Sequence, residues 1–306
     1  MLQSCRDYLA KERWNGIVIC PYCGYDKCYV IENGKRFKCG SKECYKKFSV
    51  TVGTIFHASN IPLNKWFMAV YVLTAHKKGI SSYQLGKDIG VSQKSAWFMM
   101  HRIREALKED YPNLLDGTVE IDETYIGGKM KNKHKEIRNK AHVDNVSHTA
   151  NKTGVMGILE RESEIRLKII DSSKETLKGM VRKHVNKEAT VITDSLISYK
   201  GLDKEYKLHE VVNHIEEEFV RGNFHTNSVE GAFSLLKRGI IGIYHQVSIK
   251  HLERYCDEFS YRYNNRKMKD ADRFNVTLGR IEGRLTYKQL VNHGKESQAN
   301  QTKAKG

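Results

Sequence analysis

Four cysteines arranged as two closely spaced pairs constrain this chain of 306 residues more than any other feature. The pairs are Cys20 with Cys23 and Cys39 with Cys44, and fifteen residues separate them. Two such pairs, each on a tight turn, can converge on one tetrahedral zinc ion. The chain has seven cysteines, an odd number that argues against a disulfide framework. The N-terminal region is therefore predicted to hold a structural zinc ion.

The residues around these cysteines favour a small β ribbon. Short strands are expected at 28–31 and 35–38, joined by a turn at Asn33–Gly34, with a closing strand at 48–54. Cys28 could replace one of the four ligands. Glycines stand directly after Cys23 and Cys39, where the chain must bend sharply, and so favour the original two pairs.

The balance of charge indicates a polyanionic partner. Lys and Arg number 52 against 36 Asp and Glu, a net charge of +16, which nucleic acid would neutralise most simply. No apolar run approaches the roughly 18 residues of a membrane helix, and the N-terminus has no signal-peptide core. We expect a cytoplasmic protein.

Three helices are expected after the ribbon, at 62–76, 81–89 and from Gln93 to 107. The last two are separated by a short turn containing Gly90, which is typical of a helix-turn-helix whose second helix enters the major groove. Gln93, Lys94 and Ser95 begin that second helix and are the candidate DNA contacts. An ordinary three-helix packing module would show the same pattern, but the basic charge favours DNA.

From residue 117 the pattern changes to strands. The expected order is three strands, a helix, two further strands and a late helix, at 118–128, 153–160, 165–171, 174–186, 190–194, 208–212 and from 227. This is the order of an RNase H-like α/β fold with a mixed sheet. The whole chain is thus predicted to be a multidomain α+β protein.

Acidic residues stand where that fold carries its catalytic groups. Asp122 lies in the first strand, Asp194 ends the fourth, and Glu230 is in the first turn of the late helix. Lys237 follows Glu230 by seven residues, two helical turns less about 20°, and so shares its face. Carboxylates suit Mg²⁺, and two such ions promote in-line displacement at phosphorus, while a lysine can hold the phosphate.

Other acidic residues leave alternatives open. Glu120 would share a strand face with Asp122, whereas alternation puts Glu123 on the opposite face. Asp171 also ends a strand, but the third rather than the fourth. Asn227 and Glu230 together also match a helix capping box, which would not exclude a metal-binding role for Glu230.

Over residues 13–267 the sequence resembles bacterial insertion-sequence DDE transposases of the ISXO2-like type, which carry an N-terminal zinc ribbon. The matching stretches are Cys20–Gly24, Val119–Lys129, Val191–Ser195, His225–Gly239, His251–Tyr255 and Tyr261–Arg266. The resemblance implies that Asp122, Asp194 and Glu230 bind Mg²⁺ or Mn²⁺ and that Lys237 assists them. Some relatives use an asparagine as third ligand, so Asn227 is the alternative to Glu230.

The resemblance also implies partners and a location. The partners would be double-stranded DNA, at the ends of the element and at the target, and further copies of the chain assembled on that DNA. A bacterial nucleoid location follows from the same resemblance. Three activities remain to be weighed: a transposase, a structure-selective nuclease, and an inactive DNA-binding regulator. Three intact acids and separate DNA-reading modules favour the transposase.

A basic segment at 129–140 holds six basic residues and one acid. Lys131, Lys133 and Lys135 in this segment, and Arg238 in the late helix, are expected to bind the DNA backbone by releasing counterions. A solvated loop is the alternative for the segment. The predicted organisation is a zinc ribbon at 12–58, a helix-turn-helix at 59–112, a catalytic domain at 113–270, and a C-terminal extension with a disordered tail at 271–306.

Overall fold

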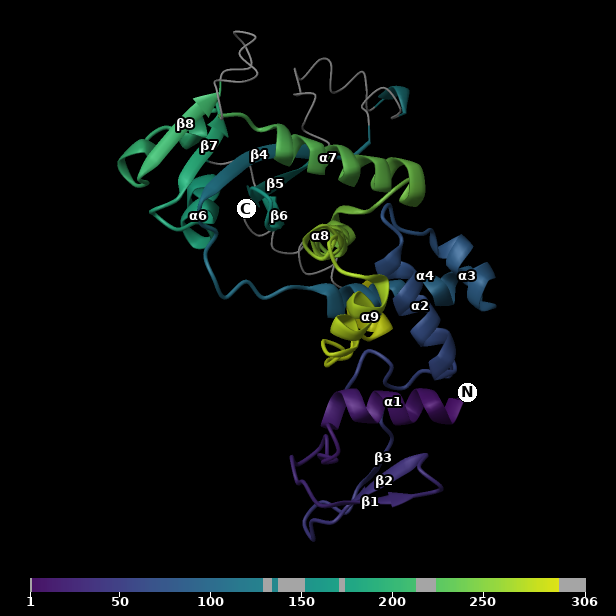
Figure 1. Ribbon diagram of the computed structural model, residues 1–306. Coiled ribbons are helices and arrows are strands. Elements are labelled where there is room, and N and C mark those ends of the chain that lie inside the picture. The colour runs from purple at the N-terminus through teal and green to yellow at the C-terminus, as the bar shows by residue number, and fades with distance from the viewer. Residues whose placement is uncertain (1, 129–133, 137–151, 171–173, 213–223, 292–306) are drawn as a thin grey trace, which may run out of the picture. The chain divides into compact units, whose positions relative to one another are not determined.

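The computed structural model describes residues 2–128, 134–136, 152–170, 174–212 and 224–291 (Figure 1). The chain divides into two compact units. One comprises residues 1–108 together with 267–306, and the other comprises residues 109–266. No helix in the described part of the chain is both long and apolar enough to cross a membrane.

A three-stranded antiparallel ribbon opens the first unit. Its strands are β1 (Cys28–Ile31), β2 (Arg36–Cys39) and β3 (Lys47–Phe48), in the order β1-β2-β3. The ribbon is too small to bury its own apolar face, and helix α1 (Leu2–Trp14) covers it. The ring of Trp14 lies 5.1 Å from that of Phe37 and 6.1 Å from that of Phe48. The first two strands confirm the prediction, whereas α1 was not predicted.

The closing strand of the ribbon is shorter than expected. β3 ends at Phe48, and the predicted strand at 48–54 is wrong beyond that residue. The chain turns instead, with Val52 donating a backbone hydrogen bond to Ser49 and Thr54 to Thr51. Gly53, at φ 83°, adopts a backbone conformation that a strand does not use.

The three predicted helices are present as α2 (Leu63–Ala75), α3 (Ser82–Ile89) and α4 (Gln93–Leu107). Ser81 and Ser92 cap α3 and α4 by accepting hydrogen bonds from Gln84 and Ser95, and Gly90 ends α3 in the left-handed conformation. Both helices could be predicted from the sequence because the signals at their ends are local.

The described residues from 268 to 291 fold back onto this unit. Helix α9 (Asp270–Leu278) packs against α2, with the ring of Phe274 lying 5.5 Å from that of Phe67. Arg273 donates to the carbonyl of Thr74 at 2.8 Å. Arg102 of α4 donates to the carbonyl of Leu285 at 3.0 Å. The C-terminal segment therefore stabilises the helices of the first unit.

The second unit is built on a five-stranded mixed sheet in the order β6-β5-β4-β7-β8. The strands are β4 (Thr118–Ile126), β5 (Thr153–Glu160), β6 (Ile165–Ile170), β7 (Thr190–Asp194) and β8 (Leu208–Val212). The first three are antiparallel neighbours, and β7 runs parallel to β4 and β8. This arrangement is consistent with the predicted RNase H-like fold.

Helices cover both faces of the sheet (Figure 1). Helix α6 (Lys174–His184) packs with Val119 and Ile121 on one face, and α7 (Asn227–Gly239) with α8 (Ile249–Asn264) covers the other. The second unit also contains the short helices η2 (Ile197–Tyr199) and η3 (Leu202–Lys204) and the π-helical turn η5 (Ile240–Tyr244). Strand alternation therefore sends β4 side chains into two separate cores.

Candidate active site

Two aspartates lie side by side where neighbouring parallel strands end their pairing. The β4–β7 register runs as far as Ile121 opposite Thr193. Asp122 and Asp194 are the next residue on each strand. Because parallel strands present corresponding residues at the same level, the two carboxylates come together.

Glu123 joins this pair, contrary to the expectation that strand alternation turns it away. Carboxylate oxygens of Asp122, Glu123 and Asp194 lie within 4.8 Å of one another. The β4–β7 pairing ends at Ile121, and Glu123 stands two residues beyond it. The backbone N–H of Glu123 donates to Asp122 Oδ1 at 2.7 Å, which orients that carboxylate.

Asp122, Glu123 and Asp194 form an acidic cluster. Repulsion between their carboxylates disfavours the state in which all three are ionised. Burial, followed by the negative charges of Asp194 and Asp122, raises the pKa of Glu123 to about 8. A divalent cation would relieve this repulsion, and carboxylate oxygens are the ligands that Mg²⁺ and Mn²⁺ prefer. The three side chains therefore fit a divalent metal.

Glu120, the alternative to Asp122 on the same strand face, is committed to a different task. Its side chain is fully buried and accepts hydrogen bonds from the backbone N–H groups of Ser228 and Val229, at 2.9 and 3.0 Å. It also pairs with Arg161 Nε at 2.6 Å. The carboxylate thus caps the positive N-terminus of α7 and is not available to a metal. Asp171, another alternative, lies outside the described residues.

Helix α7 approaches the sheet closely beside Asp122. Gly157 pairs with Asp122 across β4 and β5. A Cβ atom on Gly157 would lie 2.8 Å from side-chain atoms of Phe233 and Val229, so only glycine permits this contact. Val229 and Phe233 therefore pack directly above the strand position next to the acidic cluster.

The direction of α7 sets the level of its polar residues. The first turn of α7 is bonded to Glu120, and Lys237 near the end of the helix lines a common pocket with Tyr125 and Ile126 of β4. Glu230 precedes Lys237 by seven residues, which is roughly 10 Å along the helix. The acidic cluster precedes Ile126 by three or four residues, which is also roughly 10 Å along the strand. Glu230 is therefore expected at the same level as the cluster. Glu230 is exposed, and its Oε1 accepts a hydrogen bond from Thr226. Among the described acids it is not one of the three that come within 4.8 Å.

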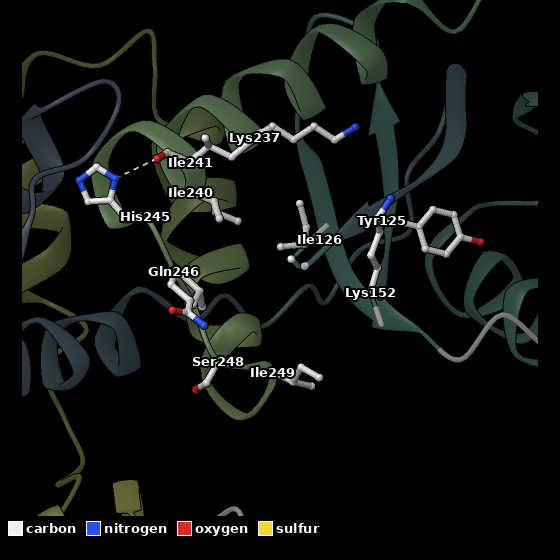
Figure 2. Close-up of a pocket in the computed structure, with 13 residues that line it drawn as sticks. Tyr125, Ile126, Lys152, Lys237, Ile240, Ile241, His245, Gln246, Ser248 and Ile249 are labelled. Atoms are coloured by element: carbon white, nitrogen blue, oxygen red, sulfur yellow. Dashed lines mark hydrogen bonds between the residues drawn. The ribbon is translucent and has the colours of Figure 1, made fainter. Parts of the chain in front are cut away.

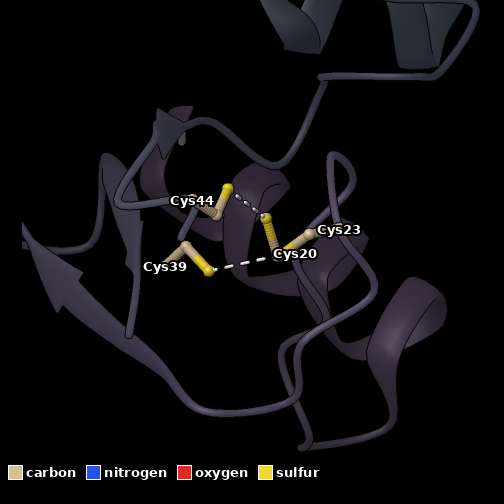
Figure 3. A group of neighbouring side chains, drawn as sticks. All are labelled: Cys20, Cys23, Cys39 and Cys44. Atoms are coloured by element: carbon tan, nitrogen blue, oxygen red, sulfur yellow. Dashed lines mark hydrogen bonds between the residues drawn. The ribbon is translucent and has the colours of Figure 1, made fainter. Parts of the chain in front are cut away.

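The predicted zinc ligands do converge (Figure 3). Sγ atoms of Cys20 and Cys44 lie 3.8 Å apart, and those of Cys23 and Cys39 lie 3.6 Å apart. Four sulfurs around zinc at about 2.3 Å stand about 3.8 Å from one another in a tetrahedron, so the site fits that metal. The thiol of Cys28 instead donates to the carbonyl of Tyr25 and is outside the group of four.

The candidate DNA contacts occupy the first turn of α4, as expected. Gln93 Nε2 donates to Ser82 Oγ at 2.9 Å, and the hydroxyl of Ser95 accepts from Ser92. Lys94 is exposed, with its Nζ 5.7 Å from the centre of the Tyr287 ring. Their role in binding DNA stays a prediction.

The other predicted backbone contacts are only partly described. Lys131 and Lys133 lie outside the described residues, whereas Lys135 and Arg238 are exposed. Arg238 Nε donates to the carbonyl of Ser234, one helical turn earlier on α7. The contribution of these four side chains to DNA affinity therefore stays a prediction.

Acidic groups meet where the β4–β7 pairing ends on a mixed sheet, and the same chain carries a four-cysteine ribbon. This combination is typical of transposases with a zinc ribbon. Residues 114–264 match the ISXO2-like transposase domain, and residues 3–47 match the transposase zinc-ribbon domain. The chain therefore belongs to the ISXO2-like DDE transposase family.

A relative in Halobacterium salinarum supports this assignment. It is described as an uncharacterized protein in transposable element ISH50 and is 30% identical over 278 residues, covering 83% of this chain and 88% of the relative. The expected bacterial source finds no support here, because this relative is archaeal.

Proposed function

We propose that this protein cleaves DNA strands at the ends of an insertion sequence and joins the freed 3′-hydroxyl to target DNA. The observation that carries the proposal is the meeting of Asp122 and Asp194 at the end of two paired parallel strands. In a chain of the DDE transposase family, two such aspartates would bind the metal ions that phosphoryl transfer requires.

Glu230 is proposed as the third acid. On α7, Glu230 lies about 100° round the helix from Val229, which faces the sheet, whereas Asn227 lies about 160° from it. Glu230 therefore lies nearer than Asn227 to the side of α7 that faces the sheet. The Glu230 carboxylate accepts a hydrogen bond from Thr226, so the side chain has to rotate to bind a metal at the site.

Divalent ions held by Asp122, Asp194 and Glu230 would activate the attacking oxygen and stabilise the leaving one. Lys237, on the same side of α7 as Glu230, holds a phosphate of the scissile strand through its ammonium group. Glu123 adds a fourth carboxylate that sets the charge of the site. Glu120 keeps α7 at the height above the sheet that this arrangement requires.

The first unit is proposed to recognise the element ends. Its zinc ribbon and the α3–α4 pair are modules that other proteins use on duplex DNA, and Lys94 is exposed at the start of α4. The net charge of +16 adds affinity that does not depend on sequence. Recognition and catalysis are thus assigned to different units of the chain.

The test is a gel assay of nicking and joining on a duplex that carries the inverted repeat of the element. Asp122→Asn and Asp194→Asn should each abolish both steps while leaving DNA binding and zinc content intact, because each removes a metal-binding charge without removing volume. Glu188→Gln, an exposed change in the same unit, is the control and should retain activity.

Three outcomes contradict the proposal. Cleavage without joining would make the protein a nuclease. Binding without cleavage by the wild-type protein would make it a regulator. Full activity in either aspartate variant would exclude the acidic cluster as the catalytic site.

A further inference from the structure

A pocket of about 820 Å³ lies in the second unit, farther along β4 than the acidic cluster (Figure 2). One wall is the end of β4, at Tyr125 and Ile126, and the other is formed by Lys237 and the π-helical turn η5. Because β4 rises about 3.3 Å per residue, the pocket begins roughly 10 Å beyond Asp122. A DNA strand with its scissile phosphate at the cluster would therefore bring a nearby nucleotide to the pocket.

The pocket combines apolar and cationic side chains. Figure 2 shows Ile126 and Ile240 within it, with Lys152 and Lys237 also among the lining residues. None of the 13 described residues that line it is acidic. Such a combination matches a nucleotide, which has an apolar base and an anionic phosphate.

Two large apolar side chains are exposed at this pocket. Ile241 is 69% exposed and Ile249 is 67% exposed. A stacked duplex would present only phosphates and groove edges to them, whereas an unstacked base presents an apolar face. Their exposure therefore favours an unstacked nucleotide over regular duplex as the occupant.

The backbone around Ile240 and Ile241 has an unusual conformation. The π-helical turn η5 follows α7, and its first two residues, Ile240 and Ile241, both line the pocket. His245 ends the turn at φ 57°, a strained conformation for a residue other than glycine, and its Nδ1 lies 3.1 Å from the carbonyl oxygen of Ile241. This contact links His245 to the start of the turn.

We propose that this pocket receives one nucleotide unstacked from the element end, close to the scissile phosphate. The base would pack on Ile240, Ile241 and Ile249, and the flanking phosphates would pair with Lys152 and Lys237. The inference rests on the proposed transposase function, because it assumes that the end of the element is bound at the acidic cluster.

The experiment uses the full-length protein and duplexes in which 2-aminopurine replaces single bases, one position at a time, through the terminal nucleotides. Fluorescence should rise severalfold at one position near the cleavage site, because unstacking relieves quenching. Ile241→Ser and Ile249→Ser should abolish that rise and slow cleavage on the order of tenfold, the loss expected for one packed base. Leu114→Ser is the control, since Leu114 is 50% exposed and precedes β4 at the end away from the pocket.

Each alternative outcome is distinct. If the wild-type protein cleaves the end without any rise in fluorescence, the pocket inference fails while the proposed function stands. If it neither binds nor cleaves the end, the proposed function fails and the inference with it. A rise that persists in both isoleucine variants would place the base elsewhere. Variants that change only the oligomeric state in sedimentation would assign the pocket to a second copy of the chain.

Discussion

The carboxylate of Glu120 accepts a hydrogen bond from the backbone N–H of Val229 at 3.0 Å, which ties the central strand to the start of α7. Glu120 stands two residues before Asp122 on the same strand face. One strand thus provides both the anchor of the helix and the first carboxylate of the candidate site. Any change in the anchor should alter the position of α7 over the acidic cluster.

Replacing Glu120 should therefore reduce stability as well as activity. Glu120→Ala leaves two helix N–H groups without their acceptor and removes the carboxylate that pairs with the half-buried Arg161, which should cost about 3 kcal/mol of unfolding free energy. Urea unfolding followed by circular dichroism measures this loss. Glu188→Gln should change the free energy by less than about 0.5 kcal/mol. A stable Glu120→Ala protein that lacks activity would instead give Glu120 a catalytic role.

The third acid can be identified by comparing two residues of one helix turn. Glu230→Gln should abolish nicking and joining, because the neutral amide removes a metal-binding charge. Asn227→Ala should retain most activity and lose at most the contribution of its place in the first turn of α7. The gel assay with Mg²⁺ and with Mn²⁺ measures both variants. An active Glu230→Gln protein beside an inactive Asn227→Ala protein would move the third ligand to Asn227.

Magnesium affinity should depend on pH through Glu123. Its pKa of about 8 means that a proton competes with the metal at neutral pH, so affinity should rise between pH 7 and 9, by at most about tenfold per pH unit. Titration calorimetry in buffers of different ionisation enthalpy should also detect release of that proton. Glu123→Gln should weaken binding and flatten the pH dependence. The same slope in the variant would exclude Glu123 from the metal site.

Acid should weaken the second unit through His184. Burial, followed by the positive charge of Arg166, lowers the pKa of His184 to about 4. The unfolded chain takes up this proton near pH 6.5, whereas the folded protein resists it until about pH 4. Stability should therefore fall across that window, by about 3 kcal/mol in all.

His184→Gln is the matched variant, because a neutral amide cannot take up the proton. The unfolding free energy is measured at pH 7 and pH 5 for the wild-type protein and for the variant. Titration of the zinc ligands affects both proteins equally and cancels in the comparison. The wild-type protein should lose about 2 kcal/mol more than the variant. Equal losses would contradict the assignment.

Zinc should be structural and restricted to the ribbon. Cys39→Ser should release about one zinc ion per chain and unfold the ribbon, because metal binding and folding are coupled in a module of this size. Elemental analysis measures the metal, and limited proteolysis locates the unfolded segment. Cys28→Ser is the control and should retain zinc. A Cys39→Ser protein with a full zinc content would exclude the four-cysteine site.

Local sequence signals determined most of the elements of this protein. The cysteine spacing predicted the ribbon, the turn at Gly90 separated α3 from α4, and the change of pattern from residue 117 predicted each strand of the larger sheet. The same patterns placed Asp122 within the first strand of that sheet and Asp194 at the end of the fourth. Such features depend on residues a few positions apart, so the periodicity of the chain expresses them directly.

Tertiary structure decided which acids meet. The alternation of β4 assigns Glu120 to the face of Asp122 and Glu123 to the other, yet Glu120 anchors α7 and Glu123 joins the cluster. Both outcomes depend on partners distant in sequence: the N-terminus of α7, which lies 108 residues beyond Glu120, and the end of β4–β7 pairing after Ile121. The cover that α1 gives the ribbon likewise depends on Trp14 meeting Phe37 and Phe48. Periodicity sets the face on which a side chain starts, but packing and pairing at sheet edges set where its polar atoms lie.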